Sequence, residues 1–95
     1  MAEVHIISYF SIETDLAAEM CSWPEFRSGA GYSIELTSSD GVEAVSVSFV
    51  ERTADEAAYV RVSSSAPGAL FERVLGRVVY ALAAHSDDVL IDRVS

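Results

Sequence analysis

The side chains that could bind a metal ion or act as a nucleophile are few and far apart. His5, Cys21 and His85 lie in three separate stretches of the sequence. A zinc site needs three or four ligands that converge on one point, and close pairs of His or Cys are its usual sign. No such pair occurs, so we expect no shared site for these residues and no cofactor. We expect Cys21 to be a small residue of the core.

Two further catalytic patterns fail on their context. The sequence has many serines but no G-x-S-x-G turn, which would expose a nucleophilic serine. Gly29 and Gly31 match the first two glycines of a glycine-rich phosphate-binding loop, but the third glycine of that motif is missing. The pair also precedes a predicted strand, whereas a phosphate loop opens a helix.

Paired carboxylates occur at Asp55-Glu56 and at Asp87-Asp88. A general acid needs a raised pKa, which burial provides. Both pairs fall in predicted turns, where side chains are solvated. We therefore expect Asp55, Glu56, Asp87 and Asp88 to contribute to an acidic binding surface rather than to catalysis.

Arg73, Arg77 and Tyr80 are spaced so that they share one face of a predicted helix. This arrangement could hold an anion. Such a stripe is more often the solvated side of a helix.

The strands that must position these residues are clearest between residues 31 and 65. An Asp-Gly pair at 40–41 is a favoured two-residue hairpin turn. With that turn, Leu36 faces Val45 and Ile34 faces Val47, and the apolar residues of both strands share one face. A slip of one residue would place apolar opposite polar residues throughout.

A third strand follows, in which Val60 and Val62 share one phase. An even number of loop residues keeps them on the same face as Val47. A four-residue loop at 54–57 is favoured over a two-residue loop, because Ala-Asp is a poor two-residue turn.

Residues 4–12 predict a first strand with apolar residues in both phases. Val4 and Ile6 lie in one phase, and Ile7 and Tyr9 in the other, with His5 beside them. Apolar residues in both phases are typical of an interior strand.

Two helices and a last strand complete the predicted elements. The first helix begins near Thr14 and ends near Trp23, because Pro24 disfavours helical geometry in the residue before it. Residues 28–31 are a connector. The second helix covers residues 67–84, and its Gly76 indicates a close approach to the sheet or to a partner. Residues 89–94 are the last strand.

The predicted order is strand-helix-strand-strand-strand-helix-strand. It indicates an α+β fold, a two-layer α/β sandwich with a mostly antiparallel five-stranded sheet and two helices on one face. Ninety-five residues are expected to form one domain, residues 1–95.

One sheet face remains uncovered in this arrangement. Ile7, Tyr9, Val50 and Tyr59 take the outer phase of their strands, among small hydroxyl residues. Apolar residues on an open face can mark an interface, so we expect these four to form a binding patch for a partner protein or for a second copy.

Composition excludes several classes of partner. The net charge is −9, from six Arg and fifteen Asp plus Glu, with no Lys. Nucleic acids and anionic membranes require clustered Lys and Arg, so we expect neither. A single cysteine favours a reducing compartment, and no signal peptide or membrane span is visible, so we expect a cytoplasmic protein.

These observations favour a small acidic protein-binding or regulatory module, similar in profile to inhibitors and immunity proteins. The alternative is a small homo-oligomeric enzyme. Its pocket would lie between helices and sheet and would be lined by Tyr9, Tyr32, Trp23 and His5. A purely structural subunit is a third possibility.

Overall fold

The computed structural model describes residues 2–8, 18–30, 33–50, 53–54, 59–85 and 89–94. The fold is α+β, with an antiparallel sheet and two helices. Residues 18–20 are helical and belong to the first helix, and α2 is the second. The elements are β1 (Ala2–Ser8), β2 (Phe26–Ala30), β3 (Ser33–Thr37), β4 (Ala44–Val50), β5 (Tyr59–Ser64), α2 (Ala69–His85) and β6 (Val89–Arg93).

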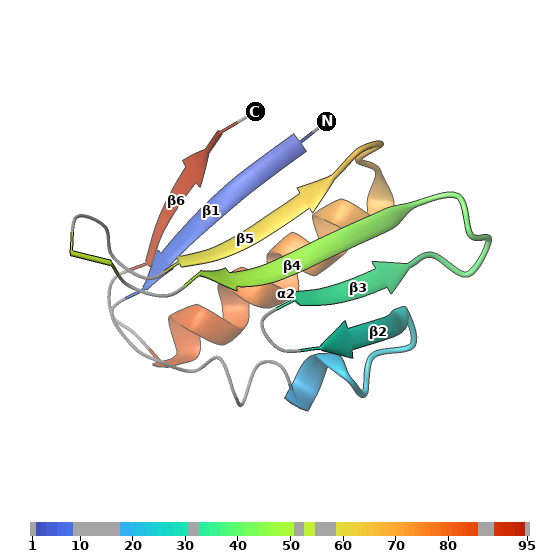
Figure 1. Ribbon diagram of the computed structural model, residues 1–95, viewed down its shortest axis with the longest axis horizontal. Coiled ribbons are helices and arrows are strands. Elements are labelled where there is room, and N and C mark those ends of the chain that lie inside the picture. The colour runs from blue at the N-terminus through green and yellow to red at the C-terminus, as the bar shows by residue number, and fades with distance from the viewer. Residues whose placement is uncertain are drawn as a thin grey trace.

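The sheet has six strands in the order β2-β3-β4-β5-β1-β6, and every neighbouring pair is antiparallel (Figure 1). The predicted five strands are therefore one too few. β1 lies in the interior between β5 and β6, as its two apolar phases indicate. Helix α2 lies across one face of the sheet.

The additional strand is β2, in the region predicted to be a connector. It pairs with β3 through a register shift between Phe26 and Ser28. A Cβ on Gly29 would lie 3.2 Å from Cε2 of Phe26 and 3.3 Å from Cγ1 of Ile34. Gly29 therefore lets the Phe26 ring lie close against the backbone of β2.

The predicted register of the first hairpin is confirmed: Leu36 faces Val45 and Ile34 faces Val47. The turn itself differs. Gly41 N–H donates to Ser38 O (2.9 Å), Ser38 N–H donates to Glu43 O (2.9 Å), and only Gly41 has a positive φ, 76°. The loop therefore comprises residues 39–42. It is longer than predicted by one residue on each side, so the register does not change.

The second hairpin has a different register from the favoured loop. Val50 faces Tyr59, whereas a loop at 54–57 would place Val50 opposite Arg61. The favoured four-residue loop is therefore wrong, because the observed partner of Val50 differs from the predicted one by two residues. A shift of two leaves each side chain on its face, and Val60 and Val62 are buried beside Val47 as predicted.

The core lies between α2 and the sheet face that α2 covers. Its buried apolar side chains are Val4, Ile6, Met20, Ile34, Leu36, Val45, Val47, Phe49, Val60, Val62, Leu70, Phe71, Val74, Val78 and Leu82. These residues follow period two in the strands and periods of three and four in α2, which is why the faces were predictable.

The prediction that Cys21 belongs to the core is wrong, and so is a close approach of Gly76 to the sheet, whereas an approach of Gly76 to a partner stays a prediction. Cys21 is exposed, because the helical residues end at Met20 and Cys21 lies in the turn that follows. Gly76 is exposed too, and a Cβ built there would meet no atom within 4 Å. Gly76 therefore does not serve a close approach of α2 to the sheet.

In the part of the chain that the structure describes, no helix is both long enough and apolar enough to cross a membrane.

Candidate functional site

The sheet face away from α2 carries a row of apolar side chains across four strands. Leu90 of β6 faces Ile7 of β1, Ile7 faces Tyr59 of β5, and Tyr59 faces Val50 of β4. Leu90 is 55% exposed, and the other three side chains are half-buried. We call these four residues the apolar row.

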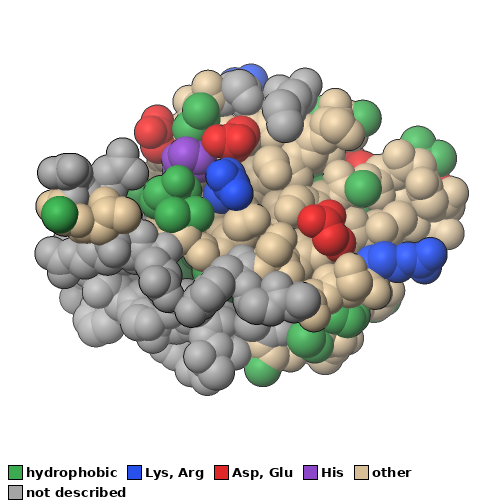
Figure 2. Space-filling model, in the orientation of Figure 1, with side chains coloured by type: hydrophobic (Ala, Val, Ile, Leu, Met, Phe, Trp, Pro, Cys, Tyr) green, Lys and Arg blue, Asp and Glu red, His purple; other side chains and the backbone are tan. Residues whose placement is uncertain are grey.

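A row of polar side chains runs beside the apolar row. Asp92, His5, Arg61 and Ser48 face one another in turn across the same four strands. Figure 2 shows this face, with a histidine next to acidic, basic and apolar side chains. An apolar stripe bordered by charges of both signs is typical of a protein-binding surface.

His5 connects the two rows. Its ring stacks on Tyr59, with centroids 4.3 Å apart and an interplanar angle of 23°. Its Nε2 lies 2.8 Å from Oε2 of Glu3. These contacts hold the Tyr59 ring in place on the open face.

The structure places the predicted binding residues only in part. It brings Ile7, Val50 and Tyr59 together, and their role in binding stays a prediction. Tyr9, Asp55, Glu56, Asp87 and Asp88 lie outside the described residues. Leu90 was not predicted, because the face on which it lies can be assigned only once β6 is known to pair with β1.

The apolar row lies at the end of the sheet where β1 and β4 end and where β5 and β6 begin. In the sequence, the segments 9–17, 51–58 and 86–88 directly follow or precede these strand ends. Counted in the sequence, they contain seven of the fifteen acids and one Arg. The seven are Glu13, Asp15, Glu51, Asp55, Glu56, Asp87 and Asp88.

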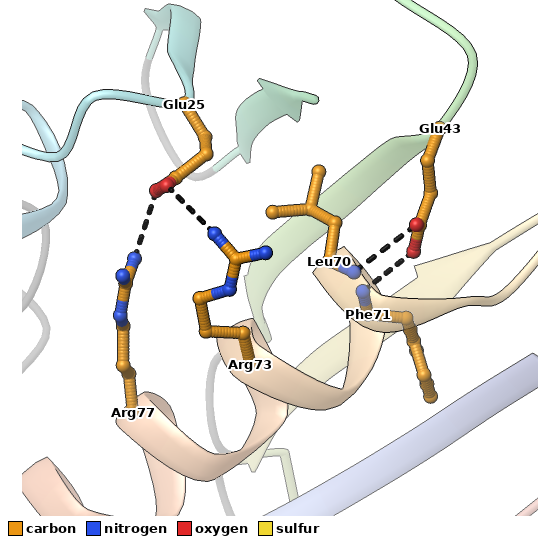
Figure 3. A network of polar contacts seen from close by, with 6 residues as sticks. All are labelled: Glu25, Glu43, Leu70, Phe71, Arg73 and Arg77. Atoms are coloured by element: carbon orange, nitrogen blue, oxygen red, sulfur yellow. Dashed lines mark hydrogen bonds and ion pairs between the residues drawn. The ribbon is translucent and has the colours of Figure 1, made fainter. Parts of the chain in front are cut away.

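The anion held by the α2 arginines is a carboxylate of the chain itself. Arg77 Nη1 donates to Oε1 of Glu25 (2.9 Å), and Arg73 Nη1 lies 3.6 Å from Oε2 (Figure 3). The Glu25 side chain is only 8% exposed. The Arg77 guanidinium also lies over Trp23, 4.9 Å from the ring centroid. Tyr80, 79% exposed, belongs to the solvated side of α2.

This ion pair joins the segment before β2 to α2. The hydrogen bond from Arg77 lowers the pKa of Glu25 below its ordinary value of 4.5; burial acts in the opposite direction but does not prevail. The expectation of a merely solvated arginine stripe is therefore wrong for Arg77.

A second carboxylate caps α2. Glu43 Oε2 accepts a hydrogen bond from the N–H group of Phe71 (2.6 Å), and Oε1 accepts one from Leu70 (3.0 Å) (Figure 3). Oε2 also accepts one from the N–H group of Gly68 (2.9 Å). Desolvation alone would raise the pKa of Glu43. The three backbone donors outweigh it, so that the pKa is lowered from 4.5.

The geometry does not support the pocket of the enzyme alternative. His5 lies on the open face, whereas Trp23 packs on the side of α2, so the sheet separates them. Tyr9 and Tyr32 lie outside the described residues. Within the described ranges, no group of three His, Cys, Asp or Glu side chains could hold a metal ion.

Comparisons with known proteins give no relative. No protein-family model matches the chain, and no curated protein or solved structure does so either.

Proposed function

We propose that this chain is a small acidic protein-binding or regulatory module, inhibitor- or immunity-like in kind, whose binding surface includes the apolar row. The observation that carries the proposal is the placement of Leu90, Ile7, Tyr59 and Val50 side by side on the sheet face that no described helix covers. Tyr59 offers apolar area with a polar tip, a combination enriched at protein interfaces.

Charge supports a basic protein as the partner. The net charge is −9, and almost half of the acids belong to segments that adjoin, in the sequence, the strand ends near the apolar row. Opposite charge raises the rate of association and orients the partner, while burial of the apolar row supplies affinity. The single cysteine supports a reducing, cytoplasmic setting.

A pair of matched tyrosine variants tests the proposal. Tyr59→Glu places a charge in the apolar row, and Tyr80→Glu places the same charge on the solvated side of α2. Tagged wild-type and variant proteins are used to recover partners from native lysate, and recovery is quantified by mass spectrometry. We expect Tyr59→Glu to lose a basic partner that both wild type and Tyr80→Glu retain.

Circular dichroism melting curves verify that both variants are folded. Recovery of the partner should also fall as salt is raised, because screening removes the attraction between separated charges. If folded Tyr59→Glu recovers the same proteins as wild type, in the same amounts, the apolar row is not the binding surface and the proposal is wrong.

A further inference from the structure

The outer edge of β6 pairs with no other strand among the described residues, and it carries exposed apolar side chains. Leu90 is 55% exposed, Ile91 57% and Val94, just after the strand, 50%. Leu90 lies on the open face, whereas Ile91 faces the same side as Ile6, toward α2. An edge strand that is apolar on both faces is a template for pairing with another chain.

The backbone groups available for that pairing follow from the ladder between β1 and β6. Val94 N–H donates to Glu3 O (2.9 Å). Backbone groups alternate in direction along an antiparallel strand, so Leu90 and Asp92 also point to β1. Val89, Ile91 and Arg93 therefore direct their N–H and C=O groups to the free edge.

A hollow on the α2 side of this edge leaves room for a neighbour. It has a volume of about 400 Å³ between α2 and the strands β1 and β6. Its apolar lining includes Val4, Phe71 and Leu75, and Arg93 lies at its border. Ile91, on the same face, is thus only partly covered by the chain's own helix.

We propose that β6 pairs antiparallel with β6 of a second copy, around a two-fold axis at Ile91. In this register Ile91 faces Ile91 of the second copy, and Val89 faces Arg93 in both directions. All three outward N–H groups and all three outward C=O groups of β6 then form hydrogen bonds. The two sheets become one continuous sheet with both α2 helices on the same side.

Other registers that keep the faces matched are poorer. Sliding one strand by two residues in one direction places Asp92 opposite Asp92, and like charges directly opposite destabilise a ladder. A shift in the other direction centres the contact on Leu90 and leaves Arg93 without a partner inside β6. The register centred on Ile91 avoids both faults, because Asp92 then faces Leu90.

Charge supports a second copy at this place despite the overall charge of −9. β6 contains one Asp and one Arg, so the strand itself is neutral. A contact of the same patch with itself closes as a two-fold dimer, the commonest assembly. The pairing does not depend on the proposed function, since Ile91 lies on the face opposite the apolar row.

Disulfide trapping tests the register. In a Cys21→Ser background, Ile91→Cys places two thiols in a hydrogen-bonded pair, with Cα atoms ~5.5 Å apart, which suits a disulfide. Val42→Cys is the control, because Val42 is 80% exposed and lies in the first hairpin loop. We expect Ile91→Cys to form linked dimers roughly tenfold faster or more, because pairing holds the thiols at an effective concentration in the millimolar range.

Sedimentation of the unmodified chain gives the second readout. A strand of this length buries less than the ~800 Å² per partner of a standard interface, so dimers are expected in the micromolar range or above. Ile91→Arg should weaken the dimer roughly tenfold or more by placing like charges opposite each other, and Val42→Arg should not.

A monomer at all concentrations, together with equal linking rates for Ile91→Cys and Val42→Cys, would overturn the proposal. The β6 edge would in that case be open to a strand of a different protein.

Discussion

The two edge strands of the sheet, β2 and β6, differ in regularity, in charge and in the apolar side chains that they expose. At the β2 edge the chain has a register shift at Phe26 and Ser28, a charged Arg27 and a glycine, and the preceding Glu25 is bound to α2 by Arg77. At the β6 edge, Leu90 and Ile91 are more than half exposed on opposite faces. Irregular and charged edges resist pairing, whereas regular apolar edges invite it.

The contacts of α2 with the chain near the two edge strands also differ. The carboxylates of Glu25 and Glu43 join α2 to the residues just before β2 and just before β4. Among the described residues no ion pair joins α2 to β6, whose Leu90 and Ile91 are more than half exposed.

The largest expected effect comes from breaking the tie at the β2 edge. Arg77→Met keeps an unbranched side chain but removes the guanidinium that lies over Trp23. It leaves the nearly buried carboxylate of Glu25 with only the longer contact to Arg73. We expect a loss of about 3 kcal/mol in the free energy of unfolding, measured by urea denaturation.

Arg73→Met is the matched control. Arg73 is 51% exposed and 3.6 Å from the carboxylate, so its loss should cost under about 1 kcal/mol. Equal effects of the two variants would mean that Glu25 does not depend on the close contact with Arg77.

The central strands supply the next largest effect and a reference between the two edges. Val47 is fully buried under α2, and Val47→Ala should cost about 1–3 kcal/mol through lost burial and a cavity. Ser46 lies on the open face, where its hydroxyl donates to Glu35 in an exposed hydrogen bond, so Ser46→Ala should be nearly neutral. Similar losses in urea denaturation would contradict the assignment of the two faces.

A smaller and opposite effect is expected on the solvated side of α2, away from both edges. Gly76→Ala adds a methyl group that meets no atom within 4 Å. The variant should raise the melting temperature, with a gain of up to about 1 kcal/mol from helix propensity. A loss of stability would show that the added methyl group meets an obstacle beside Gly76.

The smallest effect is the dependence of stability on pH at the β2 edge. The pKa of Glu25 is lowered from 4.5 in the folded chain, chiefly by the Arg77 hydrogen bond, so the unfolded chain binds more protons below that value. The contribution of Glu25 is present above pH 4.5 and is lost as the pH falls through the folded pKa. Glu25→Gln should therefore flatten the acid limb of stability, and an unchanged limb would contradict the ion pair.

The register of β3 and β4 was predictable because two independent features agree: alternation in both strands and an Asp-Gly turn. The turn was wrong in detail without effect on the register, since the loop grows equally on both sides of its centre. The second hairpin lacked a turn signal of that quality, and only the faces of its residues could be predicted.

β2 was not predictable from local pattern. Its residues Phe-Arg-Ser-Gly-Ala contain one large apolar side chain and no alternation, and the strand forms because β3 provides a partner. The structural roles of the Glu25 and Glu43 carboxylates were not predicted for a related reason. Glu25 meets Arg77 and Glu43 meets Leu70 across long stretches of sequence, and only the folded chain brings them together. Arg73 and Arg77 did indicate an anion site, but not that its occupant belongs to the same chain.

The most direct test of the difference between the edges is amide hydrogen exchange at low and high protein concentration. Ile91 and Arg93 direct their N–H groups to the free edge of β6, so their exchange should slow as the concentration rises and the strands pair. The amides of β2, at the irregular and charged edge of the sheet, should exchange at the same rate at both concentrations. Exchange at Ile91 and Arg93 that is independent of concentration, or slowing at β2 instead, would contradict this account.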